Sequence, residues 1–219
     1  MTAYQSVEDL PQLIPVFPLD GAVLLPGGEL PLQIFEPRYL NMIDDAMAGD
    51  RVIGMIQTRG GSRARPKLAA IGGLGRITSY AETSDGRYLI TLTGVCRFEA
   101  GEELDLRMPY RQVRAGYARF EDDLAEDGES VDAGEVARAR FAKALKRFLN
   151  RRELDINWDE ARDAPLEALV NSLCMGLPFE PSEKQALLEA PDLIGRFEVL
   201  TTLLEIDGGD SDDGRRSVQ

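Results

Sequence analysis

An alternating run near the middle of the chain, residues 87–98 (RYLITLTGVCRF), constrains the fold more than any other segment. Period-2 alternation predicts a β-strand with one buried face. The run follows Ser84-Asp85-Gly86, a turn signal in which the glycine tolerates a positive φ. Residues 70–83 are therefore the expected partner strand of a hairpin. One face of the run is apolar and the other is polar. The apolar face carries Tyr88, Ile90, Leu92, Cys96 and Phe98, and the polar face carries Thr91, Thr93 and Arg97.

The rest of the first 120 residues also favours strands. Residues 51–58 and 110–120 are two further predicted strands, and residues 14–35 form short apolar pieces separated by prolines. Proline is excluded from central ladder positions, so these pieces are expected at edges or strand ends. One helix is predicted to begin at Pro37 and to stop at Gly49. Strands of mixed length with a single helix indicate a compact antiparallel barrel-like domain.

The last 85 residues favour helices. Apolar stripes at helical spacing predict four amphipathic helices joined by short connections, which is typical of a small antiparallel bundle. The third helix is announced by a capping-box spacing at residues 182–185, and the fourth follows Asp192. The stripes are Ala137, Phe141, Ala144, Leu145 and Phe148; Leu166, Leu169, Val170 and Leu173; and Leu193, Phe197, Leu200 and Leu204.

The acidic residues are concentrated in two segments. The net charge is −13, from 25 basic and 38 acidic side chains. Residues 121–135 hold eight acids and no bases, and the segment from Glu205 has five acids against two arginines. Both segments are rich in Gly, Ser, Asp and Glu, so they are expected not to pack. The sequence thus predicts a β domain at 13–120, a linker at 121–135, a helical bundle at 136–206 and a disordered tail at 207–219.

Several kinds of catalytic chemistry lack the residues they need. The chain has no histidine, and its two cysteines, Cys96 and Cys174, cannot form a thiolate zinc site alone. The glycines around Gly73 are interpreted as relief of twist in a strand pair, because the third glycine of a dinucleotide fingerprint is absent. No phosphate-binding loop of the type GxxxxGK[ST] is present. We therefore expect no cofactor, no metal and no catalytic residues.

The absence of a signal peptide and of a long apolar run predicts a cytoplasmic protein that does not enter membranes.

Residues 14–56 resemble the N-terminal domain of the Lon ATP-dependent protease family. The shared features are Pro-Val-Phe-Pro-Leu at 15–19, Leu-Pro at 25–26, Leu-Pro-Leu at 30–32, Phe-Glu-Pro-Arg-Tyr at 35–39 and Ala-Gly-Asp at 48–50. Gly-Val-Cys-Arg-Phe at 94–98 is similar to a Gly-x-x-Arg-Phe strand of that domain. The resemblance extends over about residues 13–206.

The resemblance implies an α+β fold, namely an antiparallel pseudo-barrel of the PUA-like type (pseudouridine synthase and archaeosine transglycosylase) with one helix, followed by a C-terminal helical bundle. It also implies a non-catalytic module that binds unfolded or degron-bearing polypeptides, or the Lon protease itself as an adaptor. The residues considered for such a surface are Phe35, Arg38, Tyr39 and Tyr80. For Phe35 and Tyr39 a core position is the open alternative, and Arg38 is equally able to pair with Glu36.

An RNA-binding function is the second hypothesis. One basic loop, at residues 59–67, carries Arg59, Arg63, Arg65 and Lys67. Such a loop is able to contact phosphate, and some barrels of this fold type bind RNA. Phosphate binding requires a positive local potential, however, and the neighbouring acidic segment opposes one. Nucleic acid is therefore the less favoured partner.

Overall fold

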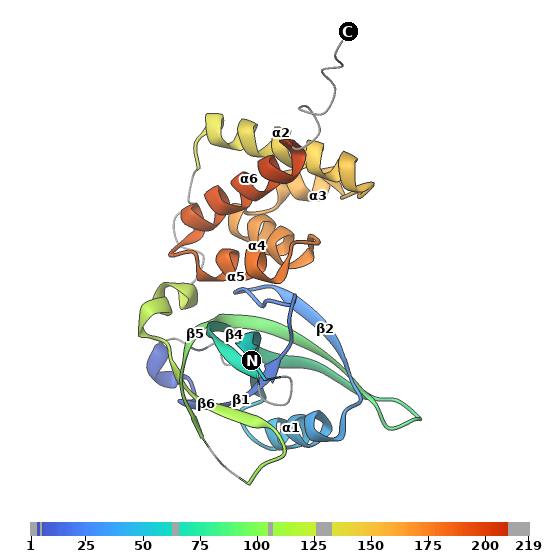
Figure 1. Ribbon diagram of the computed structural model, residues 1–219, viewed down its shortest axis with the longest axis vertical. Helices are drawn as coiled ribbons and strands as arrows, with labels where there is room; N and C mark the ends of the chain where they lie inside the picture. Colours follow the sequence, from blue (N-terminus) through green and yellow to red (C-terminus); the bar gives the residue numbers. More distant parts are fainter. Residues whose placement is uncertain (1–3, 5, 63–65, 105–106, 126–132, 210–219) are drawn as a thin grey trace. The chain divides into compact units, whose positions relative to one another are not determined.

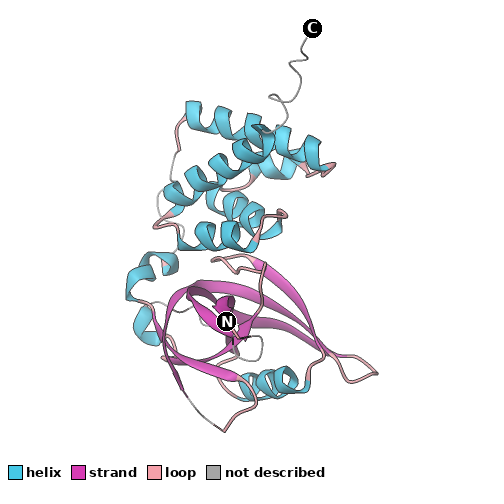
Figure 2. Ribbon diagram, in the orientation of Figure 1, coloured by secondary structure: helices cyan, strands magenta, loops and turns pink. Residues whose placement is uncertain are grey.

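A computed structural model describes residues 4, 6–62, 66–104, 107–125 and 133–209. The chain forms two compact units, each built from two separate stretches of sequence. The first unit comprises Met1–Gly128 and Met175–Glu189, and the second comprises Glu129–Cys174 and Ala190–Gln219. The first holds the strands, and the second holds most of the helices (Figures 1 and 2).

The strands of the first unit form one mixed sheet that closes on itself (Figure 2). The sheet order is β2-β5-β4-β3-β1-β6, and β6 also pairs with β5, which closes the barrel. All pairings are antiparallel except that between β1 and β3, which is parallel; the expected barrel was entirely antiparallel. The strands are β1 (Leu13–Pro18), β2 (Glu29–Ile34), β3 (Val52–Gly61), β4 (Pro66–Glu82), β5 (Tyr88–Leu104) and β6 (Arg111–Gly116).

The expected hairpin is the β4–β5 pair, in which Glu82 lies opposite Tyr88. In the turn, Gly86 has φ of +76° and its N–H donates to the carbonyl of Thr83 over 3.0 Å. The strands are longer than predicted, and β5 pairs with β2 through its first residues and with β6 through its last. A single long strand therefore joins the edge of the sheet to the closure of the barrel.

Two glycines in this hairpin are required by a close crossing. The segment 23–28 passes over β4 and β5, and hydrogen bonds join Gly27 N to Gly94 O and Gly94 N to Gly28 O. A Cβ on Gly73 would lie 1.9 Å from the carbonyl oxygen of Leu24, and one on Gly94 would lie 1.9 Å from that of Leu25. A bulge between Leu74 and Gly75 agrees with the predicted twist, but the crossing is the stronger reason for glycine.

Two apolar clusters form the core of the first unit. One lies within the barrel around Phe98, whose ring fills the space that a Cβ on Gly54 or Gly72 would need. The other packs under α1 (Pro37–Ala48), the predicted helix, which ends at Gly49. Its buried residues are Tyr39, Met42, Ile43 and Ala46. Leu40 and Met47 are partly buried and pack against the same cluster, so the apolar face of the helix is wider than its fully buried residues.

The predicted strand at 110–120 ends early, and part of the acidic segment is packed. After β6 the chain forms the 3-10 helix η2 (Ala118–Leu124), and Phe120 is buried. Asp123, in the segment expected to be an unpacked linker, pairs with Arg97, and the two side chains are only 9% and 3% exposed. The ion pair compensates the desolvation of both groups, which the local composition did not indicate. Residues 126–132 of that segment lie outside the described residues.

The helix α5 (Pro181–Glu189) belongs to the first unit, although the sequence groups it with the bundle. Its N-terminus lies one residue earlier than the expected capping box, with Pro181 first and the Glu183 carboxylate accepting from the Glu180 N–H over 2.8 Å. The side-chain amide of Gln57 donates to the carbonyl of Pro181 and to Gln185, and Gln57 accepts from the N–H of Gly21. These polar contacts fasten α5 to the barrel.

The second unit contains four helices among its described residues: α2 (Glu135–Arg152), α3 (Trp158–Asp163), α4 (Leu166–Gly176), whose last two residues belong to the first unit, and α6 (Leu193–Gly209). The sequence stripes did not predict α3, a short helix capped by Asn157. Phe141 of α2 packs on Phe197 of α6 with ring centroids 4.9 Å apart. The segment expected as a tail is helical through Gly209, and residues 210–219 lie outside the described residues.

Candidate functional site

A shallow groove of about 510 Å³ lies on the outer side of the sheet where β2, β5 and β4 meet. The strand register places Gln33, Leu89 and Ala81 in one row, with Pro31, Thr91 and Ser79 in the next. Residues opposite each other in adjacent strands share a face. Leu89 is 45% exposed, which is unusual for a leucine at the centre of three strands. We call this surface the β2 groove; its residues are Pro31, Leu32, Gln33, Ser79, Ala81, Leu89, Ile90 and Thr91.

The outer edge of the β2 groove is strand β2. Among the described residues β5 is the sole strand paired with it, so one side of the β2 backbone faces no other strand. Pro31 fits this position because it lacks the N–H that an interior strand would need. An edge strand presents unpaired N–H and C=O groups, to which an extended peptide is able to add.

Phe35 continues the exposed side of β2. Along this strand Glu29, Pro31 and Gln33 are exposed and alternate with more buried neighbours, and Phe35 is the next exposed position, with 61% of its surface open to solvent. An aromatic ring costs free energy in water and gains it when a partner covers it. Phe35 is therefore the strongest contact candidate among the residues singled out from the sequence.

Arg38 and Tyr39, the next two candidates, have different roles. The Arg38 guanidinium pairs with the Glu36 carboxylate at 2.8 Å and lies 4.5 Å from the centre of the Tyr39 ring. Tyr39 is 7% exposed and packs edge-on against Phe17, so it is a core residue, and burial raises the pKa of its hydroxyl. Arg38 is exposed at the start of α1, where the side chain is held by its two neighbours.

Tyr80 lies on the opposite face from the β2 groove. It is paired in the sheet with Ile90, whose side chain is buried, whereas the exposed Leu89 of the groove is paired with Ala81, the next residue along β4. Its ring meets that of Tyr88 edge-on at 5.1 Å. The Tyr88 hydroxyl donates to Asp44 over 2.9 Å, and this hydrogen bond raises the tyrosine pKa. The structure therefore separates Tyr80 from Phe35.

Leu89 was missed in the sequence although a signal was present. It shares the phase of Thr91 and Thr93, the polar positions of the alternating run, yet it is apolar. A large apolar residue in the polar phase of a strand is a candidate contact for a partner when it lies beside other exposed apolar groups. That exception to the alternation would have pointed to the groove more directly than the aromatic residues.

The structure describes only part of the basic loop, including Arg59 and Lys67. Arg63 and Arg65 lie outside the described residues. Arg59 and Lys67 line a second groove of about 400 Å³ together with Arg111. The Arg111 guanidinium is held by both carboxylate oxygens of Glu103 at 2.8 and 2.7 Å, so its charge is compensated. Arg59 and Lys67 still leave this groove positive, but none of its lining residues is an aromatic side chain on which a base could stack, so the RNA-binding hypothesis gains no support.

Within the described ranges, no three side chains of the types His, Cys, Asp and Glu come together as a potential metal site. Of the helices that the structure describes, none combines the length and the apolar character needed to cross a bilayer.

A closed barrel with an exposed edge groove and a helical unit is an α+β binding-domain architecture, and comparison with known proteins identifies the family. The family model described as the ATP-dependent protease La (LON) substrate-binding domain matches residues 13–205. The chain belongs to this family. The match covers nearly all of the residues that the structure describes, including both units.

Relatives and solved structures agree. Lon protease 2 of Myxococcus xanthus is 28% identical over 202 residues, which are 90% of this chain and 24% of that protein. The chain spans about a quarter of the length of the curated relatives it matches. The fold is similar to a Lon N-terminal domain protein from Xanthomonas campestris (TM-score 0.62, 21% identity, covering 87% of this chain and 97% of that one). It is equally similar to the N-terminal domain of Mycobacterium avium complex Lon protease (TM-score 0.62, 20% identity, covering 88% and 98%).

Proposed function

We propose that this chain is a non-catalytic recognition module that binds polypeptide segments in the β2 groove. The observation that carries the proposal is the exposed apolar surface of Leu89 and Phe35 beside a sheet edge, in a chain whose family is described as the substrate-binding domain of a protease. The substrate of a protease is a polypeptide, and its unfolded regions expose apolar side chains and unpaired backbone groups. The β2 edge and its groove are complementary to both.

The proposed binding geometry is strand addition. An extended segment would form main-chain hydrogen bonds with the free edge of β2, and its side chains on the exposed face would lie next to Pro31 and Gln33, at the rim of the groove that Leu89 lines. Phe35 would cover the end of the segment, and Arg38, held beside it, would meet a carboxylate or a main-chain carbonyl. Main-chain pairing is independent of sequence, which suits a module that recognises unfolded or degron-bearing chains of many kinds.

A direct binding measurement tests this function. The probe is a short fluorescein-labelled peptide of alternating leucine and serine, and the readout is fluorescence anisotropy. Removing both anchors in Phe35→Ala/Leu89→Ala should raise Kd at least about tenfold, equivalent to about 1.4 kcal/mol. Tyr80→Ala is the matched control, because it removes an exposed aromatic from the opposite face. Equal affinities for the double variant and the unaltered protein would refute the β2 groove as the site.

Lon protease itself is the second proposed partner, in the cytoplasm, with this chain acting as an adaptor. Addition of the purified chain to Lon protease should then accelerate degradation of an unfolded substrate, and the Phe35→Ala/Leu89→Ala variant should not. An unchanged degradation rate with the unaltered chain would remove the adaptor role and leave peptide binding untouched.

A further inference from the structure

Helix α2 of the second unit carries a strong positive charge in an acidic protein. Between Glu135 and Arg152 it has seven basic residues and one acidic residue, a net charge of +6 in a chain of −13. All seven basic side chains are exposed. The seven are Arg138, Arg140, Lys143, Lys146, Arg147, Arg151 and Arg152.

Helix α6 compensates only part of this charge. Arg140 pairs with Glu205, and Arg152 pairs with Asp207 at 2.6 Å. Lys143 and Lys146 form no ion pair with any residue that the structure describes, and Arg147 has only a longer-range attraction to Glu205, whose pKa it helps to lower. Exposed like charges in consecutive helical turns repel one another, so the uncompensated charges cost stability until an anion binds.

A groove of about 390 Å³ lies beside these charges, between α2 and α6. Lys143 and Arg147 are four residues apart and therefore lie on the same side of the helix. The buried side chains of Ala144 and Leu204 form an apolar floor, and the basic side chains form the rim. The complete lining is Ala139, Arg140, Lys143, Ala144, Arg147, Leu204 and Glu205.

The apolar floor and the basic rim of the groove favour one class of anionic ligand, an acidic polypeptide, over another, a nucleic acid. A nucleic-acid backbone presents phosphates but no aliphatic groups for Ala144 and Leu204, and nucleic-acid binders typically supply aromatic side chains for the bases. None of the groove residues is aromatic. A polypeptide with neighbouring carboxylates and an aliphatic side chain offers one group for each part of the groove. The Glu205 carboxylate does not oppose this, because Arg140 already neutralises it.

We infer that the groove between α2 and α6 is a second docking surface, which binds an acidic polypeptide segment carrying aliphatic side chains. The inference rests on the proposed function in one respect, namely that the partners of this chain are polypeptides. It adds a substrate preference to it: acidic segments dock on the second unit, and apolar extended segments dock in the β2 groove of the first.

Isothermal titration calorimetry with two unlabelled peptides tests the inference on the full chain. One peptide combines glutamate and leucine, and the other has every glutamate replaced by glutamine. The acidic peptide should bind, with an affinity that falls as NaCl is added because exposed charges are screened. Lys143→Glu/Arg147→Glu should weaken its binding at least about tenfold. The matched control is Arg59→Glu/Lys67→Glu, which makes the same change of charge on the first unit and should alter Kd less than twofold.

Three results would overturn the inference: equal binding of the glutamine peptide, no effect of the α2 charge reversal, or tighter binding by single-stranded DNA of matched charge. Lys143→Gln/Arg147→Gln, which removes the charges without adding new ones, repeats the measurement in case the reversed pair distorts the helix. The leucine–serine peptide, titrated into the same variants, reports separately on the β2 groove. If Phe35→Ala/Leu89→Ala abolishes binding of the leucine–serine peptide and leaves binding of the acidic peptide unchanged, the two peptides bind at separate sites.

Discussion

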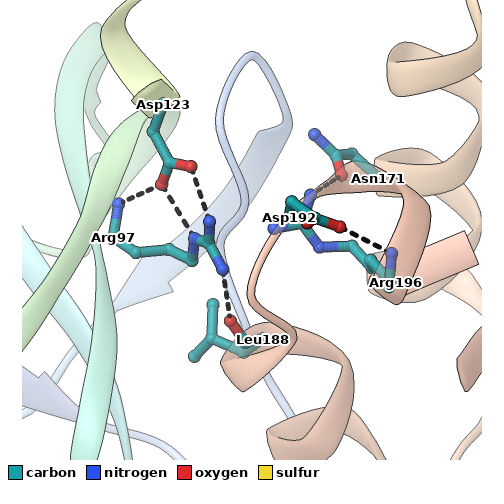
Figure 3. Close-up of polar contacts among 7 residues, drawn as sticks. Arg97, Asp123, Asn171, Leu188, Asp192 and Arg196 are labelled. Carbon is teal, nitrogen blue, oxygen red and sulfur yellow. Dashed lines mark hydrogen bonds and ion pairs between the residues drawn. The ribbon is translucent and has the colours of Figure 1, made fainter. Parts of the chain in front are cut away.

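The Asp123 carboxylate accepts three hydrogen bonds from Arg97, from its main-chain N–H at 2.9 Å, its Nε at 2.8 Å and its Nη2 at 2.7 Å (Figure 3). The same guanidinium donates to the carbonyl of Leu188 over 3.2 Å and lies 4.4 Å from the centre of the Phe120 ring. One buried arginine of β5 therefore organises η2 and the end of α5 around the barrel.

Asp123→Ala should destabilise the first unit strongly. The substitution leaves the Arg97 charge buried, where no carboxylate compensates its desolvation, and this should cost about 3–5 kcal/mol. Urea denaturation followed by circular dichroism measures the change. Glu102→Ala is the control, because that carboxylate forms a 3.9 Å ion pair with Arg114 at an exposed site. It should cost less than about 1 kcal/mol. Similar losses for both variants would contradict the role assigned to Arg97.

Gly94→Ala should disrupt the crossing of segment 23–28 over the hairpin. The added Cβ would lie 1.9 Å from the Leu25 carbonyl oxygen, so backbone has to move and hydrogen bonds to Gly27 and Gly28 have to break. We expect a loss of at least about 2 kcal/mol by thermal denaturation. Gly176→Ala meets nothing within 4 Å in α4 and should leave stability unchanged or raise it by up to about 1 kcal/mol. A neutral Gly94→Ala would show that the crossing is not tight.

Gln57→Leu should loosen α5 from the barrel. It removes the partner of the Gly21 N–H and of the Pro181 carbonyl, and unsatisfied buried groups cost about 1–3 kcal/mol. Hydrogen exchange resolved by mass spectrometry should show faster exchange in α5 than in the unaltered protein. Gln33→Leu is the control, since Gln33 is exposed in β2. Unchanged protection of α5 in Gln57→Leu would mean that apolar packing alone holds this helix.

Acid should weaken the second unit through α6. Hydrogen bonding with Arg140 lowers the pKa of Glu205, and hydrogen bonding with Arg152 lowers that of Asp207. A carboxylate whose folded-state pKa is lowered contributes stability that is present above its unfolded pKa, about 4, and lost as pH falls below it. Unfolding of this unit is readable from the fluorescence of its single tryptophan, Trp158.

The matched variant for the acid effect is Glu205→Gln/Asp207→Asn. It should be less stable than the unaltered protein near pH 7 and should lose less stability between about pH 6 and pH 3. The control Glu160→Gln/Glu167→Gln removes two exposed carboxylates of the same unit that take no part in the ion pairs between α2 and α6. Identical acid profiles for the Glu205 variant and the unaltered protein would show that these pairs do not contribute.

Local patterns in the sequence predicted the elements, and tertiary contacts decided their roles. Alternation, a glycine turn and apolar stripes predicted the β4–β5 hairpin, helix α1 and most helices of the second unit. The same alternation placed Arg97 with the polar positions Thr91 and Thr93 of β5, and nothing nearby in the sequence indicated that Arg97 would be buried against Asp123. The reason for glycine at 94 is a segment almost 70 residues earlier in the chain.

The candidate site was less predictable than the fold for the same reason. Aromatic character pointed to Phe35, Tyr39 and Tyr80, but exposure depends on which face each residue occupies. Only Phe35 continues the exposed side of β2, and Tyr39 packs in the core. The basic face of α2 was readable in the sequence, yet the charge of the whole segment 136–204 is close to zero and obscured it.

Because α5 belongs to the barrel and α6 to the helical unit, synthesis from the N-terminus cannot complete either unit early. The barrel unit is complete only when residue 189 has been synthesised, which is after the first stretch of the helical unit. The helical unit is complete only when α6 has been synthesised. On the ribosome, Gln57 and the apolar surface awaiting α5 would stay uncovered while more than 100 further residues are translated. Until α5 is made, a nascent chain of this architecture therefore exposes the part of the barrel that α5 covers, although all six strands have already been synthesised.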